Sequence, residues 1–270
     1  MRLAAFALLL GLSSCFEVTN LDRFTQPAAL VHGNYTDLKV AWRGMNAHVA
    51  QYVEYRVIDN ANVIQSRGIF DPLGAVDVSF QVPGAVPKLN GPFRFDFWAD
   101  NDENGVYDLD PAGADKDHSW RLALDSTMLN DDGQYVISFD HNFSFTNVST
   151  PTPVEIGKPV TLHITDLGTL KSKRFEMRVA DASSGHVVAL YRVGALANAT
   201  YDLIVPGMIE AGSAYQISLY TDDGSLGSVR AFSLAATASD TGLEMTFSGT
   251  NPTATPGLSE VTDKSAIVAP

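Results

Sequence analysis

The chain has 270 residues and a formal net charge of −13, with 31 acidic against 18 basic side chains. This charge argues against nucleic acid as a partner, because phosphates need a basic binding face. Hydrophobic residues make up 45% of the chain and aromatic residues 10%, which is enough to fill two cores of ordinary size. A single cysteine leaves stability to core burial and bound ions.

The N-terminal stretch "MRLAAFALLLGLSSC" has the features of an export signal. One positive charge, Arg2, precedes an uncharged run over residues 3–12 that is too short to span a bilayer. The segment ending in Cys15 resembles the bacterial lipobox, which implies that Cys15 is diacylated and that the membrane is a partner; an ordinary signal peptide is the alternative. An aspartate after the cysteine would indicate retention in the inner membrane; Phe16 stands there instead, which favours the outer membrane if the cell is Gram-negative.

Short segments of alternating polar and apolar residues follow, separated by turn residues such as Pro-Gly and Asn-Gly. "VEYRVID" (53–59) matches "FEMRVAD" (175–181). "FQVPGAV" (80–86) matches "LIVPGMI" (203–209), and "FRFDFWADND" (93–102) matches "YQISLYTDDG" (215–224). Matches in the same order indicate a duplicated domain.

Each copy resembles the immunoglobulin-like and fibronectin-type sandwiches in strand pattern and length, without the cysteine pair of true immunoglobulin domains. We therefore expect an all-β fold of two tandem immunoglobulin-like antiparallel β-sandwich domains. The expected boundaries are a signal peptide at 1–14, a lipidated linker at 15–33, domain 1 at 34–147, domain 2 at 148–249 and a disordered tail at 250–270.

The segment "ADNDENGVYDLDPAGADKDHSW" (99–120) is an acidic insertion that the second copy replaces with a short turn. Its start is similar to the first half of an EF-hand-type calcium loop, with oxygen ligands at alternate positions and a glycine at the bend. The last ligand place is filled by Pro111, so the loop would need other carboxylates. A solvated acidic hairpin on an Asn-Gly turn, or a transition metal site, are the alternatives. The candidate calcium ligands are Asp100, Asp102, Asn104, Val106 (through its carbonyl), Asp108, Asp110 and Asp117.

Three histidines of the first copy are expected at the same end of its sandwich as the acidic loop. If each connection reverses the chain, His48 follows strand one, His118 opens strand six and His141 closes strand seven. These side chains could bind zinc or copper, with Met45 as a soft ligand for Cu(I). No pair has tight ligand spacing, so ordinary hydrogen-bonding roles are the competing interpretation.

No catalytic motif is present: the chain lacks a Gly-x-Ser-x-Gly elbow, a His-Glu-x-x-His motif and a glycine-rich phosphate loop. We therefore expect a non-catalytic, lipid-anchored protein of the cell envelope. In the leading hypothesis, calcium stabilises a surface module for binding or adhesion to an unknown protein or glycan. An envelope copper- or zinc-binding protein is the first alternative. Accessory carbohydrate-binding domains, with Trp120 stacking on a sugar, are the second.

Overall fold

The computed structural model describes residues 33–89, 91–107, 117–143, 153–171, 173–196, 198–222 and 229–261. Cys15 and the predicted ligands Asp108 and Asp110 lie outside these residues. The described part is built from β-strands and three-residue 3₁₀ helices, so the fold is all-β. In the same residues, no helix has the length and apolarity that a membrane span requires.

Two seven-stranded units follow each other along the chain, and both have the same strand connections. In each, the first, fourth and seventh strands form a three-stranded sheet, in which the first and seventh strands are parallel. The segments that match in the sequence occupy equivalent strands of the two units. The first unit contains β1 (Tyr35–Arg43), η2 (Asn46–His48), β2 (Val53–Ile58), β3 (Ile64–Phe70), β4 (Val78–Pro87), β5 (Phe93–Ala99), β6 (His118–Leu124), η3 (Ser126–Met128), β7 (Tyr135–Asp140) and η4 (His141–Phe143).

The second unit repeats this order and adds a C-terminal strand. It contains β8 (Lys158–Asp166), η5 (Gly168–Leu170), β9 (Phe175–Asp181), β10 (Val187–Val193), β11 (Tyr201–Ile209), β12 (Ala214–Asp222), β13 (Val229–Thr237) and β14 (Leu243–Ser248). The helix η6 (Pro252–Ala254) and strand β15 (Ser259–Glu260) follow it.

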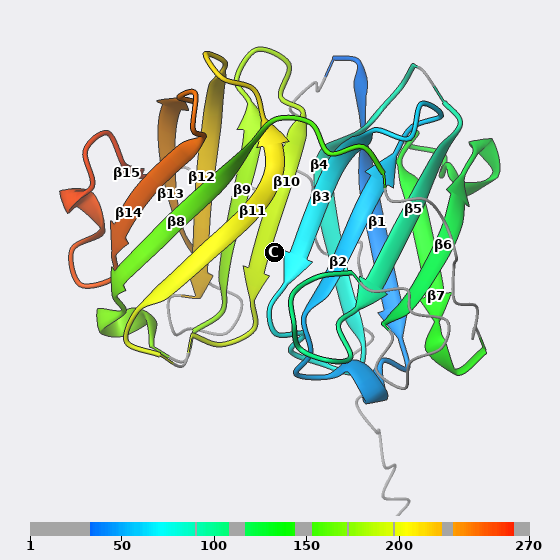
Figure 1. The fold of residues 1–270 in the computed structure, drawn as a ribbon, viewed down its shortest axis with the longest axis horizontal. Coiled ribbons are helices and arrows are strands. Elements are labelled where there is room, and N and C mark those ends of the chain that lie inside the picture. Colours follow the sequence, from blue (N-terminus) through cyan, green and yellow to red (C-terminus); the bar gives the residue numbers. More distant parts are fainter. Residues whose placement is uncertain are drawn as a thin grey trace, which may run out of the picture.

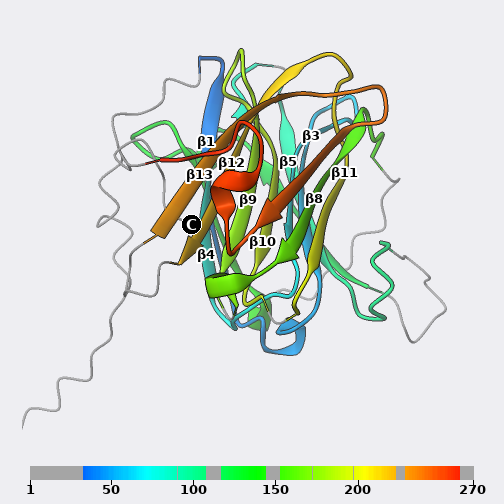
Figure 2. The same cartoon turned by 90° about the vertical axis from the view of Figure 1, so that its left-hand side faces the viewer.

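The units share one sheet, which differs from the expected pair of separate sandwiches. Strands β3 and β10 pair in parallel, and this joins the remaining strands into a nine-stranded sheet of order β15-β13-β12-β9-β10-β3-β2-β5-β6. In Figure 1 the sheet β11-β8-β14 lies in front of the large sheet on the left, whereas β4-β1-β7 lies behind it on the right. Figure 2 shows the large sheet between them from the side. The two sandwiches therefore lie on opposite faces of a common layer.

The central strands alternate between the two cores. In β3, Ile64 and Ile69 pack into the second core, whereas Phe70 packs into the first. In β10, Val187 and Leu190 complete the first core, although they belong to the second unit. Because of this exchange, every residue of β2 is buried, where the sequence pattern indicated a strand with one solvated face.

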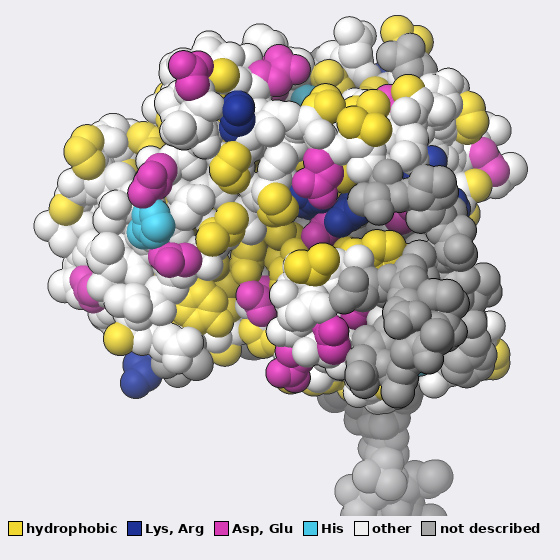
Figure 3. All heavy atoms as spheres, in the orientation of Figure 1, with side chains coloured by type: hydrophobic (Ala, Val, Ile, Leu, Met, Phe, Trp, Pro, Cys, Tyr) yellow, Lys and Arg dark blue, Asp and Glu magenta, His cyan; other side chains and the backbone are white. Residues whose placement is uncertain are grey.

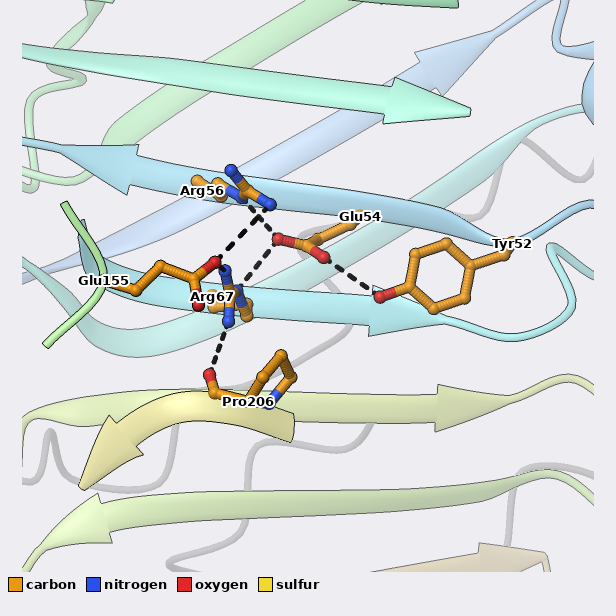
Figure 4. Close-up of polar contacts among 6 residues, drawn as sticks. All are labelled: Tyr52, Glu54, Arg56, Arg67, Glu155 and Pro206. Atoms are coloured by element: carbon orange, nitrogen blue, oxygen red, sulfur yellow. Dashed lines mark hydrogen bonds and ion pairs between the residues drawn. The ribbon is translucent and has the colours of Figure 1, made fainter. Parts of the chain in front are cut away.

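A buried network of charges crosses the junction of the units (Figure 4). Glu54 lies 2.5 Å from Arg56 and 2.9 Å from Arg67, and Arg67 is fully buried. Arg67 also pairs with Glu155 and donates to the carbonyl of Pro206 on β11. Burial would raise the pKa of Glu54, but the charges of Arg67 and Arg56 outweigh it and hold the pKa below its usual value. The Glu54–Arg56 pair and its counterpart in the second unit, Glu176–Arg178, thus both lie inside the protein.

Order extends beyond residue 249, where the sequence predicts a disordered tail to begin. Strand β15 pairs with the edge of β13, and Leu258 is buried against the second core. Glu260 forms an ion pair with Arg230 at 3.0 Å. Pairing with an open sheet edge and burial of one leucine give this segment contacts that its Pro/Thr-rich composition does not indicate. Residues 262–270 lie outside the described part.

Arg67→Ala should lower the free energy of unfolding by about 3–5 kcal/mol, because it leaves buried Glu54 with one partner fewer and the Pro206 carbonyl without its donor. Arg174→Ala serves as the control, since Arg174 is 59% exposed and pairs with Asp222. It should cost less than about 1 kcal/mol. Urea denaturation measures both values, and equal costs for the two variants would contradict a stabilising junction.

Candidate metal centre

Strand register brings the three predicted histidines to one end of the first unit. Strands β1 and β7 are parallel and in register at Arg43 and Asp140, so the helices that follow them, η2 and η4, lie at the same end. Strand β5 ends there too. Its last residue, Ala99, pairs with His118 at the start of β6, and His118 contacts His48 of η2. The seven strands have the number and order on which the sequence prediction depended.

One ring nitrogen from each residue of this His trio (His48, His118 and His141) lies close to those of the other two. His48 Nε2 lies 3.2 Å from His141 Nε2 and 3.3 Å from His118 Nδ1. All three nitrogens lie within 4.8 Å of one another. A tetrahedral ion with metal–nitrogen bonds of roughly 2.0–2.1 Å would separate its ligand nitrogens by about 3.3–3.4 Å. A square-planar ion would separate neighbouring nitrogens by about 2.8–3.0 Å. The separations of 3.2 and 3.3 Å are therefore close to those of nitrogens that share a metal ion.

Gln51 fixes the protonation of His48. The Oε1 of Gln51 lies 2.8 Å from His48 Nδ1, and its Nε2 donates to Asn101 Oδ1 at 3.1 Å. An amide oxygen can only accept, so with the Gln51 amide in this orientation the proton of neutral His48 is on Nδ1. Its Nε2 then carries the lone pair that faces the other two rings, as in a metal ligand oriented by an outer hydrogen bond.

The trio lies over the indole of Trp120. Each imidazole meets this ring edge-on, with centroid distances of 5.4 Å for His48, 6.0 Å for His118 and 5.5 Å for His141. His48 is fully buried, and the other two histidines are partly exposed. Burial lowers the pKa of His48 to about 4, and the hydrogen bond to Gln51 opposes this only in part. A neutral imidazole at pH 7 is the form that binds a metal ion.

Trp120 itself cannot offer a stacking surface to a sugar, because only 4% of the residue is exposed. Trp42 and Trp98 are equally buried, at 0% and 3%. The glycan-stacking role considered for Trp120 is therefore not supported by its position. Met45 is also fully buried, as part of the first core.

The corresponding end of the second unit lacks the three histidines. Its helix η5 ends at Leu170, the counterpart of His48, and Arg230 pairs with Thr221 as His118 pairs with Ala99. Gly249 takes the place of His141 after the seventh strand. By these pairings Arg230 is equivalent to His118, and the insertion in the first copy is about ten residues long. The duplicated fold thus forms without the trio.

A second group of ligand atoms lies in the acidic loop. Carboxylate oxygens of Asp100, Asp102 and Asp117 lie within 4.8 Å of one another; Asp100 and Asp117 are buried and Asp102 is exposed. Asp100 accepts hydrogen bonds from the backbone of Asn104 and Gly105, and burial raises its pKa despite them. Exposed acidic side chains such as Asp102 are common without an ion.

The other predicted loop ligands are less well placed. The side chain of Asn104 is occupied within the loop, since its amide donates to Asp102 at 2.8 Å and its oxygen accepts from the backbone of Val106 at 2.6 Å. Asp108 and Asp110 lie outside the described residues. Calcium binding by this loop stays a prediction.

Sequence reasoning did not identify Gln51 and Asn101, the two residues that connect the groups. Gln51 stands three positions after His48, just past a 3₁₀ turn, which places it beside the ring of His48. Asn101 follows Asp100 directly in the loop. A side-chain amide three residues from a candidate ligand is the one local signal that could have drawn attention to Gln51.

Comparisons with known proteins do not assign this chain to a family. No family model matches it, and no curated protein matches it. A C-terminally truncated tip fimbrial protein, Mfa3 from Porphyromonas gingivalis, is similar over 74% of this chain and 81% of its own, with 13% identity and a TM-score of 0.26. A proposed cell adhesion protein from Parabacteroides distasonis is similar over 85% and 92%, with 7% identity and a TM-score of 0.22. TM-scores this low do not support assigning the fold or the function of either protein to this chain.

The metal-free protein should lose stability as pH falls from about 6.5 to about 4. Burial lowers the pKa of His186, like that of His48, to about 4, so in this window the unfolded chain binds protons that the folded chain does not. Each histidine should lower the free energy of unfolding by up to roughly 1.4 kcal/mol for each unit by which the pH falls in this window. Urea denaturation at several pH values measures the slope.

His186→Phe provides the internal test of this pH dependence, because phenylalanine retains an aromatic ring against Tyr35, whose ring lies 4.1 Å from His186. The variant should have a shallower slope between pH 6.5 and 4. An unchanged slope would show that His186 is not held neutral by its surroundings.

Proposed function

We propose that this chain is an exported, lipid-anchored, non-catalytic protein that binds a late first-row transition metal ion at the His trio. The observation that supports it is the approach of three imidazole nitrogens to one centre, with two distances of 3.2 and 3.3 Å. A single lone pair on His48 Nε2 can accept one good hydrogen bond, yet two ring nitrogens face it. A cation at the centre would engage the lone pairs of all three rings.

Zinc is the ion that these ligands suit best. Neutral imidazoles bind zinc and copper well, and calcium, which prefers oxygen ligands, poorly. Two of the nitrogen separations, 3.2 and 3.3 Å, are close to the ligand spacing of a tetrahedral Zn²⁺ or Cu(I) site. Nearby carboxylates and the net charge of −13 would raise the local concentration of any dication.

Three protein ligands leave one position of a tetrahedral ion for water or an external ligand. His118 and His141 are partly exposed, so this position is within reach of solvent. The site thus supports a binding role, in which a bound ion presents a coordination position at one end of the molecule. The lipid anchor at Cys15, the outer-membrane location and a protein or glycan partner stay predictions from the sequence.

His141→Ala should weaken zinc binding by more than about 100-fold, since loss of a ligand exceeds the 10- to 100-fold effect of losing an outer hydrogen bond. His163→Ala is the matched control, because His163 lies in β8 and pairs with Asp202 and Glu244. Competition titration with a zinc-binding dye measures the affinity, and Co²⁺ in place of zinc should give the strong visible absorption of a tetrahedral centre. Absence of zinc binding, or equal loss in both variants, would overturn the proposal.

Calcium binding by the acidic loop is the second candidate function, and the convergence of Asp100, Asp102 and Asp117 favours it. Calcium takes six to eight oxygen ligands, so backbone carbonyls, waters or further carboxylates would have to complete the site. Extracellular modules bind calcium in the range of about 10⁻⁴–10⁻³ M. A loop of this kind would work at millimolar calcium outside the cell.

Calcium at 10 mM should raise the melting temperature of the protein by about 3 °C if the dissociation constant is about 1 mM. Asp102→Asn should abolish the shift, because it removes an exposed carboxylate from the group. Asp132→Asn, in a turn before β7, is the control. Differential scanning fluorimetry measures the shift, and an identical shift in both variants would point to nonspecific screening.

A further inference from the structure

A chain of hydrogen bonds leads from the His trio to the start of the acidic loop. His48 Nδ1 donates to Gln51 Oε1 at 2.8 Å, and Gln51 Nε2 donates to Asn101 Oδ1 at 3.1 Å. Asn101 directly follows Asp100, where the chain leaves β5. One glutamine side chain therefore contacts both a candidate metal ligand and the first loop residue.

Asp117, at the C-terminal end of the acidic loop, also contacts Asn101. The backbone N–H of Asn101 donates to Asp117 Oδ1 at 2.9 Å, and Asp117, which is fully buried, precedes His118 in the chain. His118 Nδ1 then lies 3.3 Å from His48 Nε2. The contacts form a closed ring through His48, Gln51, Asn101, Asp117 and His118, so two of the three ligands hold the loop base, defined as residues 100–107 and Asp117.

We infer that metal binding at the His trio controls the conformation of the loop base, and that Gln51 is the positioning residue that carries this effect. The inference rests on the proposed metal site. A bound ion would fix the imidazoles of His48 and His118. The closed set of contacts then leaves the side chains of Gln51 and Asn101 one arrangement that keeps both of their hydrogen bonds. By the reciprocity of linked equilibria, the factor by which the metal ion favours the closed loop base is also the factor by which closing the loop base raises metal affinity.

The loop base has amides that can report this coupling. The N–H groups of Asn101 and Gly105 donate to Asp117 and Asp100, so their hydrogen exchange measures how often the base opens. Saturating zinc should slow exchange at these amides by at least about fivefold, the lower end of typical coupling between sites. The experiment uses the whole protein in buffer stripped of calcium, with hydrogen exchange read by NMR or mass spectrometry.

Gln51→Leu separates the inference from the metal site itself. The variant should bind zinc about 10- to 100-fold more weakly. At saturating zinc its loop base should be slowed less than that of the wild-type protein, because only the link through His118 and Asp117 remains. Gln81→Leu is the matched control, since Gln81 contacts Asp37 at 3.1 Å on β4 and β1, outside the ring of contacts. It should retain both zinc affinity and the slowing of exchange.

Asn101→Ala provides the reciprocal test. It should weaken zinc binding, and combining it with Gln51→Leu should add little, because both changes break the same link. Failure of wild-type protein to bind zinc would overturn the proposed function and the inference together. Zinc binding with unchanged exchange in wild-type protein, or equal slowing in wild type and Gln51→Leu, would overturn the inference alone.

Discussion

The parallel pairing of β3 with β10 is the constraint on which the architecture depends. It joins the large sheets of two sandwiches into one layer and places the small sheets on opposite faces. Strands at the junction are then buried on both faces, so polar side chains there need partners. The network around Glu54 and Arg67 supplies these partners, and its opposite charges stabilise one another. Cores that exchange residues in this way are expected to unfold together.

This shared layer supplies part of the candidate site, because His118 is the first residue of β6. The other two histidines and the described start of the acidic loop follow strands at the same end of the first unit. Equivalent segments of the second unit carry Leu170, Arg230 and Gly249 and complete the same fold. The scaffold thus tolerates a change of function at its ends, as is usual where loops extend from a rigid β framework.

The sequence predicts the strands and the convergence of the three histidines for one physical reason. Alternating residues and turn signals define the strands, and an odd or even strand count determines at which end of a sandwich each loop lies. It does not predict the shared sheet, because pairing between β3 and β10 leaves no local pattern. Gln51 could not be identified either, since its role depends on a contact with Asn101, 50 residues away.

The positions of His48 and His141 along the chain have a mechanical meaning. They are 93 residues apart and follow the first and last strands of one unit, so an ion between them would close nearly that whole unit into a loop. Closing a loop of that length restricts the unfolded chain about as much as a disulfide does. The chain's sole cysteine lies near the N-terminus and cannot form a disulfide within the chain. The bound ion would therefore act as a reversible crosslink, which a chelator removes and added metal restores. The stability of the first unit would then follow the supply of that ion.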